Sequence, residues 1–301
     1  MPVENSEMPA ALPRAARDNR FRKALRALYR NRMAALGTIL LVAWILIALF
    51  APLITPYEPN EQDLYARLKP MFWSEDGKTY ILGSDHLGRD ILTRLTYGAR
   101  VSLLVGVSAA IFSGLIGLML GGLAGYLGGR LDEGIMGLAD LQMAFPSILL
   151  ALVVIAILGQ GLRNVIIVFA ITGWVQYART LRAEILSIKE REYITAIKVV
   201  GGSGSRTLFR HILPNAIAPL IVIGSFQMAS MITAEAALSY LGVGVPTSIP
   251  TWGNMLADGR EYLYNAWWIS TLPGLALMSV VLGINFLGDA LRDAIDPLMR
   301  N

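Results

Sequence analysis

Long segments without charged residues dominate the pattern of hydrophobic and polar positions along the chain. These uncharged segments are residues 33–56, 101–129, 141–162, 164–178, 212–234 and 262–288. A membrane core about 30 Å thick requires about 20 apolar residues in a helix, because each residue advances about 1.5 Å along the axis. Five segments meet that length, and residues 164–178 reach it if Arg163 or Arg179 extends its charged end to the membrane surface.

The same segments indicate helices rather than the strands of a barrel. Only these two structures satisfy the backbone hydrogen bonds of a chain surrounded by lipid. Barrel strands alternate between apolar and polar positions over about ten residues, whereas these segments are apolar throughout. The pattern therefore predicts six transmembrane helices in an all-α polytopic membrane protein.

Positive charges between the segments predict the topology. An even number of spans places both termini on one side of the membrane. If that side is the cytoplasm, the inner segments 1–32, 130–140, 179–211 and 289–301 hold 18 of the 26 Lys and Arg, and the outer segments hold the remaining 8. Because cytoplasmic loops carry the excess of Lys and Arg, we expect a plasma (inner) membrane protein with both termini in the cytoplasm.

This topology divides the chain into successive parts. They are a cytoplasmic tail at 1–32, a first span at 33–56, an external loop at 57–98, a core of five spans at 99–290 and a cytoplasmic tail at 291–301. Within the first tail, apolar residues between Phe21 and Tyr29 alternate with Arg and Lys at helical spacing. That pattern predicts a basic amphipathic helix on an anionic membrane surface.

The composition agrees with a membrane protein and excludes several other classes. Hydrophobic residues make up 54% of the 301 residues and charged residues 16%, against about 45–50% and about 25% in soluble domains. These values exclude a soluble enzyme, a disordered chain and a nucleic-acid-binding protein. The chain has no cysteine, which rules out disulfides and thiolate sites, and its two histidines, His86 and His211, argue against a histidine-rich metal site.

Glycines and prolines predict where the helices pack and bend. The glycines that recur every four residues in the second segment, and so allow close approach of another helix, are Gly117, Gly121, Gly125 and Gly129. The prolines that mark helix starts or kinks in later segments are Pro146, Pro214, Pro219 and Pro273.

The predicted spans lack the groups that ion-coupled transport requires. Proton and ion relays use carboxylates or histidines at membrane depth, and here only Asp140, Glu235 and Asp289 come near the ends of the uncharged segments. The sequence also contains no complete phosphate-binding loop. A transporter of this kind would take its energy from another chain.

The longest interior connection, residues 179–215, carries the most information. Residues 183–200 have no glycine or proline and place isoleucines at helical spacing between charged residues, which predicts an amphipathic helix outside the membrane. The glycines at 201–204 end this helix, and a second short helix begins near Ser205 and reaches Pro214. The apolar stripe must pack against its own bundle or against another protein.

This connection resembles the signature loop of permeases of ATP-binding-cassette (ABC) importers. The family pattern is E-A-A-x-x-x-G, nine residues and then I-x-L-P, and the spacing from Gly201 to Leu213 and Pro214 matches it. The residues that depart from the pattern are Thr195, Ile197 and His211, in place of Glu, Ala and Ile. The residues that fit the peptide branch of the family, which often begins E-Y-x-x-A-A, are Glu192, Tyr193 and Ala196.

Residues 82–104, 252–256 and 288–297 resemble the same family, so the likeness covers essentially residues 20–300. It is to the C-type permease subunit of dipeptide and oligopeptide importers, a group that also includes nickel and glutathione importers. The resemblance implies the type I ABC importer permease fold with six transmembrane helices. It also implies a transport subunit without an ATPase site of its own, rather than an enzyme.

The resemblance further implies a set of partners. A second, B-type permease would form a heterodimer with this chain, and two cytoplasmic ABC ATPase subunits would bind ATP and Mg. An extracytoplasmic solute-binding protein would deliver the substrate. The chain itself would bind no cofactor and no metal, and it would contact membrane lipid but no nucleic acid.

Candidate site residues follow from the matched motifs. The residues assigned to an ATPase-coupling loop at 183–215 are Glu192, Tyr193, Ala196, Gly201, Gly202, Arg206, Arg210, Leu213 and Pro214. Among them, Glu192, Arg206 and Arg210 are expected to make polar contacts with the ATPase, although a solvated face would show the same charges. The residues assigned to an external surface that faces the binding protein are Asp85, Gly88, Arg89, Asp90, Trp252, Gly253 and Asn254.

The sequence leaves several questions open. Di- and oligopeptides are the expected cargo, and nickel or glutathione are alternatives within the same family. An ion-coupled secondary carrier, which would transport without partners, is a further alternative. A membrane-embedded enzyme would need clustered acid–base or metal-binding residues at the span ends, which the sequence lacks. The residues that line the substrate path are not predicted.

Overall fold

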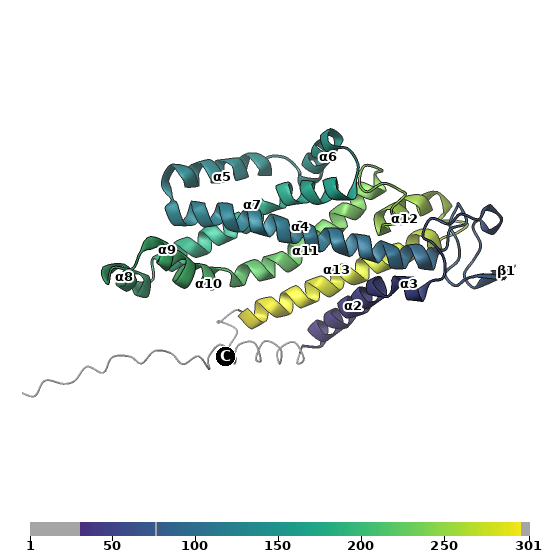
Figure 1. Cartoon of the computed structure of the whole chain (residues 1–301), viewed down its shortest axis with the longest axis horizontal. Helices are drawn as coiled ribbons and strands as arrows, with labels where there is room; N and C mark the ends of the chain where they lie inside the picture. The colour runs from purple at the N-terminus through teal and green to yellow at the C-terminus, as the bar shows by residue number, and fades with distance from the viewer. Residues whose placement is uncertain (1–30, 76, 296–301) are drawn as a thin grey trace, which may run out of the picture.

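The computed structural model describes residues 31–75 and 77–295, and these form an elongated helical bundle (Figure 1). The amphipathic helix predicted between Phe21 and Tyr29 and the last six residues of the chain lie outside the described residues. One end of the bundle carries a helical hairpin, and the opposite end carries a folded cap (Figure 1). We use "hairpin" for residues 190–216 and "cap" for residues 55–90 together with residues 241–267.

Long helices make up the bundle. Their bounds are α2 Arg32–Leu49, α4 Ile91–Leu127, α5 Gly129–Met143, α6 Ser147–Leu158, α7 Leu162–Lys189, α11 Ala218–Tyr240 and α13 Trp268–Ile295. The short α3, Ala51–Ile54, follows α2. The hairpin consists of α8 Glu192–Val199, α9 Gly204–Thr207, the π-helical turn Leu208–Ile212 and α10 Leu213–Ala216. The cap contains the 3₁₀ turns Leu64–Ala66 and Arg260–Tyr262, the strands β1 Trp73–Glu75 and β2 Lys78–Tyr80, and α12 Trp252–Gly259.

Four helices of the described chain, α2, α4, α11 and α13, are long and apolar enough to cross a membrane. A fifth crossing is formed if α5 and α6 are counted together, although they meet at a bend of 93°. The segment predicted at 141–162 is interrupted at Ala144 and Phe145, and Pro146 is the N-cap of α6, so the kink or helix start predicted at Pro146 is confirmed. The helix α7, with 28 residues, is also long enough to cross a membrane. It is less apolar than the four helices named above, because polar residues lie near both of its ends. The count of six crossings stays a prediction.

Two helices extend beyond the uncharged segments because their charged residues find partners. The helix α4 begins at Ile91 instead of near residue 101, which shortens the external loop predicted at 57–98. Arg100, inside α4, donates from Nε to the carbonyl oxygen of Ala48 at 2.6 Å. The helix α7 continues through residues 183–189, so the separate amphipathic helix predicted at 183–200 is wrong. Only its second half, α8, leaves the bundle (Figure 1).

The glycine stripe packs α4 against α7, as predicted, at Gly117, Gly121 and Gly125. A Cβ atom at Gly121 would overlap the backbone of Ala178, and one at Gly125 would lie 3.0 Å from the Cα of Arg182. The fourth glycine does not belong to the stripe. Gly129 lies after the end of α4 with φ +58°, and a Cβ there would meet no atom within 4 Å. Its role is to let the chain reverse from α4 into α5.

Gly121→Ala should destabilise the bundle by about 1–3 kcal/mol, because the added methyl group overlaps a backbone that cannot move independently. Gly134→Ala is the matched control, since a Cβ at Gly134 of α5 meets nothing within 4 Å and alanine favours a helix by about 1 kcal/mol. Thermal unfolding of the detergent-purified protein measures both. Equal unfolding midpoints for the two variants would contradict the close approach of α4 and α7.

The first and last helices place the two ends of the described chain on the same side of the bundle, as an even number of crossings requires. The start of α2 and the end of α13 both lie on the side of the bundle away from the cap (Figure 1). These two helices pack on each other, and a Cβ at Gly37 of α2 would lie 2.7 Å from the carbonyl oxygen of Gly283 in α13. Which of the two sides faces the cytoplasm is not fixed by this arrangement and stays a prediction.

Candidate functional site

The hairpin leaves the bundle at a sharp break after α7. Lys189 ends α7, and α8 begins at Glu192. Gly201 has φ +86°, a conformation that favours glycine, and the Gly202 N–H donates to the carbonyl oxygen of Ile197 at 2.9 Å. A side chain at Gly202 would collide with Ile197. The turn predicted at Gly201 and Gly202 is therefore present, and it reverses the chain between α8 and α9.

The inner face of the hairpin is fixed to the bundle by apolar packing. The buried residues of this cluster are Tyr177, Leu181, Ile185, Ile188, Ile194, Ile212, Ala216 and Leu220. They come from α7, α8, the π-helical turn, α10 and α11, so the hairpin packs on two long helices at once. The apolar stripe found in the sequence thus packs largely on its own bundle.

Polar contacts tie the hairpin to the end of α4 as well. The Tyr126 hydroxyl donates to the carbonyl oxygen of Gly204 at 2.7 Å. Just before the hairpin, Lys189 at the end of α7 donates from Nζ to the carbonyl oxygen of Tyr126 at 3.0 Å, where the last carbonyls of α4 need partners. A displacement of the hairpin would therefore reach α4, α7 and α11 together.

The outer face of the hairpin exposes large apolar side chains. Val199 is 82% exposed, Val200 88% and Phe209 67%. Two adjacent exposed valines before the turn and an exposed phenylalanine after it are costly in water, because burying a side chain of this kind contributes about 1.5–3 kcal/mol. Sequence analysis did not assign these three residues, because a motif shows spacing but not which face of a helix stays uncovered.

Most of the residues assigned to the coupling loop are exposed like this apolar tip. Those that are exposed are Glu192, Tyr193, Ala196, Gly201, Arg206, Arg210 and Pro214. Gly202 and Leu213 are half-buried. Pro214 stands in the first turn of α10 and Pro219 in the first turn of α11, as predicted for helix starts. Contact of these residues with an ATPase stays a prediction.

A buried network of charges holds the cap together at the other end of the bundle. Arg89 Nε lies 2.5 Å from Asp85 Oδ2, and Arg89 Nη2 lies 2.8 Å from Asp258 Oδ2. Arg94, which is 1% exposed, contacts the same two carboxylates at 3.7 and 3.4 Å. Two arginines therefore neutralise two carboxylates from distant parts of the chain. His86 lies near both carboxylates, but the guanidinium charges already there oppose a bound cation.

All seven residues assigned to the external surface are buried, so their expected exposure is wrong. They build the cap from within. Trp252 Nε1 donates to the carbonyl oxygen of Leu95 at 3.1 Å, and Asp90 caps α4 by accepting from the Thr93 N–H at 2.7 Å. Asn254 Nδ2 donates to the carbonyl oxygens of Val245, Pro246 and Ile249 and so fixes residues 245–249. Whether the outside of this cap meets a binding protein stays a prediction.

More exposed ion pairs occur on the same cap. Lys78 Nζ, on β2, lies 2.8 Å from Asp63 Oδ2. This hydrogen bond lowers the pKa of the Asp63 carboxyl and raises the pKa of the Lys78 ammonium. Because the pair is solvent-accessible, it contributes little to stability.

Gly88→Ala should unfold the cap locally and lower the thermal unfolding midpoint. Gly88 has φ +75°, and a Cβ there would overlap the carbonyl oxygen of Asp63. Gly77→Ala is the matched control, because Gly77 has φ +76° but faces open space. Limited proteolysis of the cap and the unfolding midpoint compare the two variants. If Gly77→Ala is as damaging as Gly88→Ala, the tight contact with Asp63 does not hold the cap.

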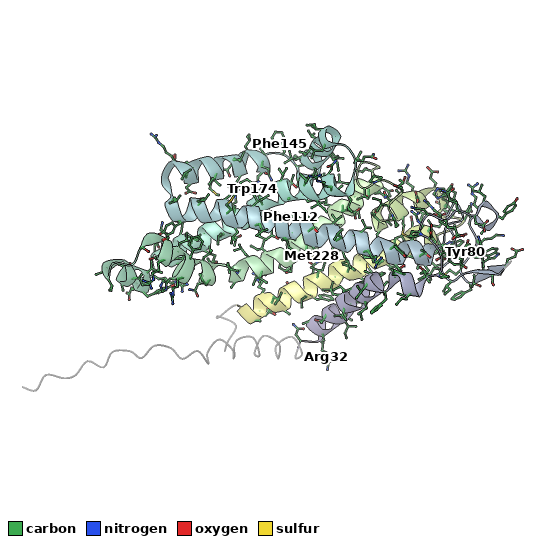
Figure 2. The ribbon with its side chains drawn as sticks, viewed as in Figure 1. Arg32, Tyr80, Phe112, Phe145, Trp174 and Met228 are labelled. Carbon is green, nitrogen blue, oxygen red and sulfur yellow. The ribbon has the colours of Figure 1, made fainter. Side chains whose placement is uncertain are left out.

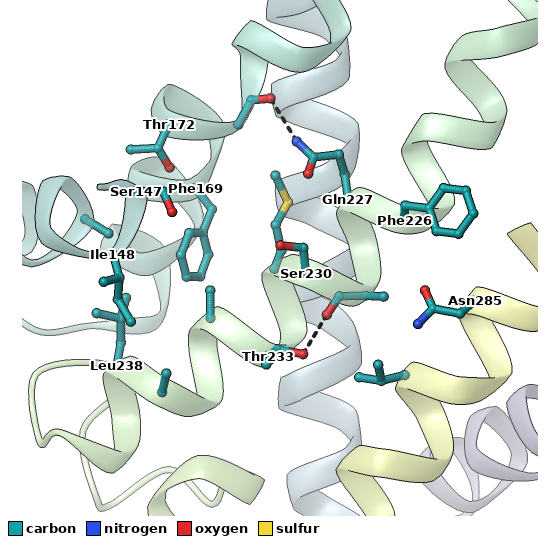
Figure 3. Close-up of a pocket in the computed structure, with 17 residues that line it drawn as sticks. Ser147, Ile148, Phe169, Thr172, Phe226, Gln227, Ser230, Thr233, Leu238 and Asn285 are labelled. Carbon is teal, nitrogen blue, oxygen red and sulfur yellow. Dashed lines mark hydrogen bonds between the residues drawn. The ribbon is translucent and has the colours of Figure 1, made fainter. Parts of the chain in front are cut away.

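Two cavities open between α6, α7 and α11 in the middle of the bundle. The cavity nearer the cap has a volume of about 610 Å³ and reaches α13 at Asn285, and the cavity nearer the hairpin has about 280 Å³ and reaches α5 at Gln142. Figure 3 shows the hydroxyl and amide groups of Ser147, Thr172, Gln227 and Ser230 around the first cavity. Neither cavity is lined by a charged residue. Sequence analysis missed both, because scattered neutral polar residues give no recognisable motif.

Comparison with known proteins places the chain among transport proteins. Residues 117–301 match the family of binding-protein-dependent transport system inner membrane components, and residues 19–70 match the N-terminal transmembrane domain of oligopeptide transport permease C. The chain is 42% identical to a di/tripeptide transport system permease protein DppC of Pseudomonas aeruginosa, over 97% of each chain. It is 40% identical to an oligopeptide transport system permease protein OppC of Bacillus subtilis, over 90% of this chain and 87% of that protein.

A solved structure supports the same fold. The MetNI methionine ABC transporter, in a structure titled as inward-facing, contains a chain that matches with a TM-score of 0.57 at 20% identity. The match covers 67% of this chain and 96% of that chain. It shows that about two thirds of this chain has the fold of a chain of an ABC transporter.

Proposed function

Since the chain belongs to the inner membrane components of binding-protein-dependent transport systems, we propose that it is a permease subunit that moves short peptides into the cell by coupling to separate ATPase subunits. In this proposal the chain crosses the membrane six times, with both termini and the hairpin in the cytoplasm and the cap outside. The relatives from P. aeruginosa and B. subtilis are a di/tripeptide permease and an oligopeptide permease, which supports peptides as the cargo.

The exposed apolar tip of the hairpin is the observation that carries this proposal. Val199, Val200 and Phe209 are exposed, while the opposite face of the hairpin is packed on α7 and α11. An exposed patch outside the membrane, fixed to the long helices, suits a site that receives force from a partner. Glu192, Arg206 and Arg210 are exposed on the same hairpin and would supply polar contacts beside the apolar ones.

The proposed mechanism uses the hairpin as a rigid connection. Two ATPase subunits bind ATP and Mg, close on each other and displace the hairpin that rests on one of them. The buried cluster around Ile194 and Ile212 passes this displacement to α7 and α11. The cavity between this chain and a second, B-type permease then changes the side on which it is open. A binding protein on the outside drives the change only if it prefers one of the two states.

Reconstitution of the complete transporter in liposomes distinguishes peptides from other cargo, and ATP from an ion gradient as the energy source. We expect peptide uptake that requires ATP on the hairpin side and is insensitive to a protonophore. This chain alone should neither hydrolyse ATP nor take up peptide. Uptake of nickel or glutathione in place of peptides would move the chain to another branch of the family, and uptake by the isolated chain along an ion gradient would contradict the proposal.

A further inference from the structure

The two cavities lie one after the other along the bundle. On α7, residues 169–173 line the cavity nearer the cap, and residues 172–176 line the cavity nearer the hairpin. On α11, the first cavity extends from Phe226 to Leu238 toward the cap, whereas the second touches α11 only at Gln227. The cavities therefore follow the direction in which a cargo would cross the membrane.

The residues common to both cavities mark the boundary between them. They are Ser147, Thr172, Gly173 and Gln227. At this boundary Gln227 Nε2 donates to the carbonyl oxygen of Gly173 at 3.2 Å, a bond from α11 to α7 (Figure 3). Gln142, which lines the cavity nearer the hairpin, donates from Nε2 to the carbonyl oxygen of Thr172 at 2.6 Å. Side-chain amides thus bind two successive backbone carbonyls of α7.

The surroundings hold this boundary in place. A Cβ at Gly173 would overlap the Cε of Met231 in α11 and lie 3.1 Å from the Cβ of Ser113 in α4, so a side chain at this position would require Met231 to move. Trp174 Nε1 donates to Gln142 Oε1 at 2.9 Å, and Figure 2 shows Trp174 beside α5. Gln142 is therefore fixed from two sides, whereas Gln227 has a single hydrogen bond among the described residues. Gln227 is the group that can exchange its partner.

We propose that the Gln227 amide forms the constriction of the substrate path in this chain, and that main-chain amides of a passing peptide replace its hydrogen bond to Gly173. This inference rests on the proposed function. A side-chain amide offers one donor and one acceptor group of the kind that a peptide bond itself offers. The first cavity, at about 610 Å³, is within the range of about 300–1,000 Å³ typical of small-ligand sites.

The chemistry of the lining predicts which property of the peptide is recognised. Because no charged side chain of this chain lines either cavity, this chain offers no ion pair that would select the cargo by the charge of its side chains. The lining of this chain offers apolar contacts, from side chains such as Phe169 and Met231, and hydrogen bonds to the peptide main chain, and these hydrogen bonds are the same for every sequence. The constriction should therefore pass peptides with acidic, basic and neutral side chains equally well. Selection between such peptides would then be made by other parts of the transporter.

Gln227→Glu tests this inference in the complete transporter reconstituted with one binding protein. The probes are tri-alanine and the tripeptides with aspartate or lysine at the central position. A carboxylate at the constriction should lower the uptake ratio of the aspartate to the lysine peptide at least tenfold relative to the unsubstituted transporter, and Gln227→Lys should shift this ratio the other way. Every transporter is measured with the same binding protein, so the preference of the binding protein for one peptide affects all the uptake ratios equally.

The matched control is Gln160→Leu. Gln160 Nε2 also donates to a glycine carbonyl, that of Gly242 at 2.7 Å, but Gln160 lines neither cavity. The control should leave the ratio unchanged. If Gln227→Glu and Gln227→Lys transport with the ratio of the unsubstituted transporter, Gln227 is not the constriction. If the unsubstituted transporter itself takes up no peptide with ATP, the proposed function has failed instead.

A second measurement tests the inference if the Gln227 variants do not assemble into a complete transporter. The chain has no cysteine, so Ser230→Cys introduces a single thiol into the first cavity. An excess of tri-alanine should slow its reaction with a water-soluble thiol reagent at least threefold during ATP-driven turnover. An unchanged labelling rate would show that peptide does not pass along this face of α11 and would overturn the inference.

Discussion

The double substitution Val199→Asp, Val200→Asp should reduce ATP-driven peptide uptake to below one hundredth of the normal rate while the protein remains in the membrane. Both side chains are more than 80% exposed and pack on nothing in the hairpin, so their loss should leave the fold intact. Burying them in an ATPase groove would contribute about 3–6 kcal/mol in total, which corresponds to about 10²–10⁴-fold in affinity. Two carboxylates in an apolar groove would weaken binding further.

Matched controls separate the loss of docking from the loss of folding. Val199→Ile, Val200→Ile keeps the apolar character at the same positions and should retain uptake and copurification of the ATPase subunits. The aspartate variant should have the thermal unfolding midpoint of the unsubstituted chain but should not retain the ATPase. Normal uptake by the aspartate variant would contradict docking through the hairpin tip.

Arg94→Met should destabilise the protein by about 3–5 kcal/mol, because it leaves buried carboxylates without sufficient positive charge. Arg94 is 1% exposed and lies between Asp85 and Asp258, with Arg89 as the other cation. The cap and the start of α4 are joined through these residues, so both should loosen. Thermal unfolding of the detergent-purified chain measures the loss.

A double-mutant cycle identifies the cause of this loss. Combining Arg94→Met with Asp258→Asn leaves Arg89 and Asp85, which still form a balanced pair at 2.5 Å. The double variant should therefore lose at least about 1 kcal/mol less stability than the sum of the two single variants. Strict additivity would mean that packing of the Arg94 side chain, and not its charge, is what stabilises the cap.

The sequence predicted those features that depend on local pattern. Gly117, Gly121 and Gly125 pack α4 on α7 because small residues four apart share one face of a helix. Pro214 and Pro219 begin helices because proline lacks the N–H that a helix interior needs. The turn at Gly201 follows from the same local reasoning.

Features that depend on distant partners were not predicted. The charged residues before residue 101 placed the start of the second segment there, but α4 begins at Ile91 because Arg94 contacts Asp258, which lies 164 residues away in the chain. The helix α7 continues to Lys189 because the Lys189 ammonium donates a hydrogen bond to the carbonyl oxygen of Tyr126. Val200 is exposed and Asn254 is buried because of how distant segments pack on each other. The sequence alone does not show which segments come into contact.

The central claim is that the hairpin tip rests on a nucleotide-hydrolysing partner. Because the chain has no cysteine, Val200→Cys can carry a single short photocrosslinker in the native membrane. We predict one dominant crosslinked product that contains an ABC ATPase subunit, with a yield that changes when ATP is trapped. Crosslinks that reach only lipid or this chain's own helices, in membranes that still take up peptide, would contradict the account.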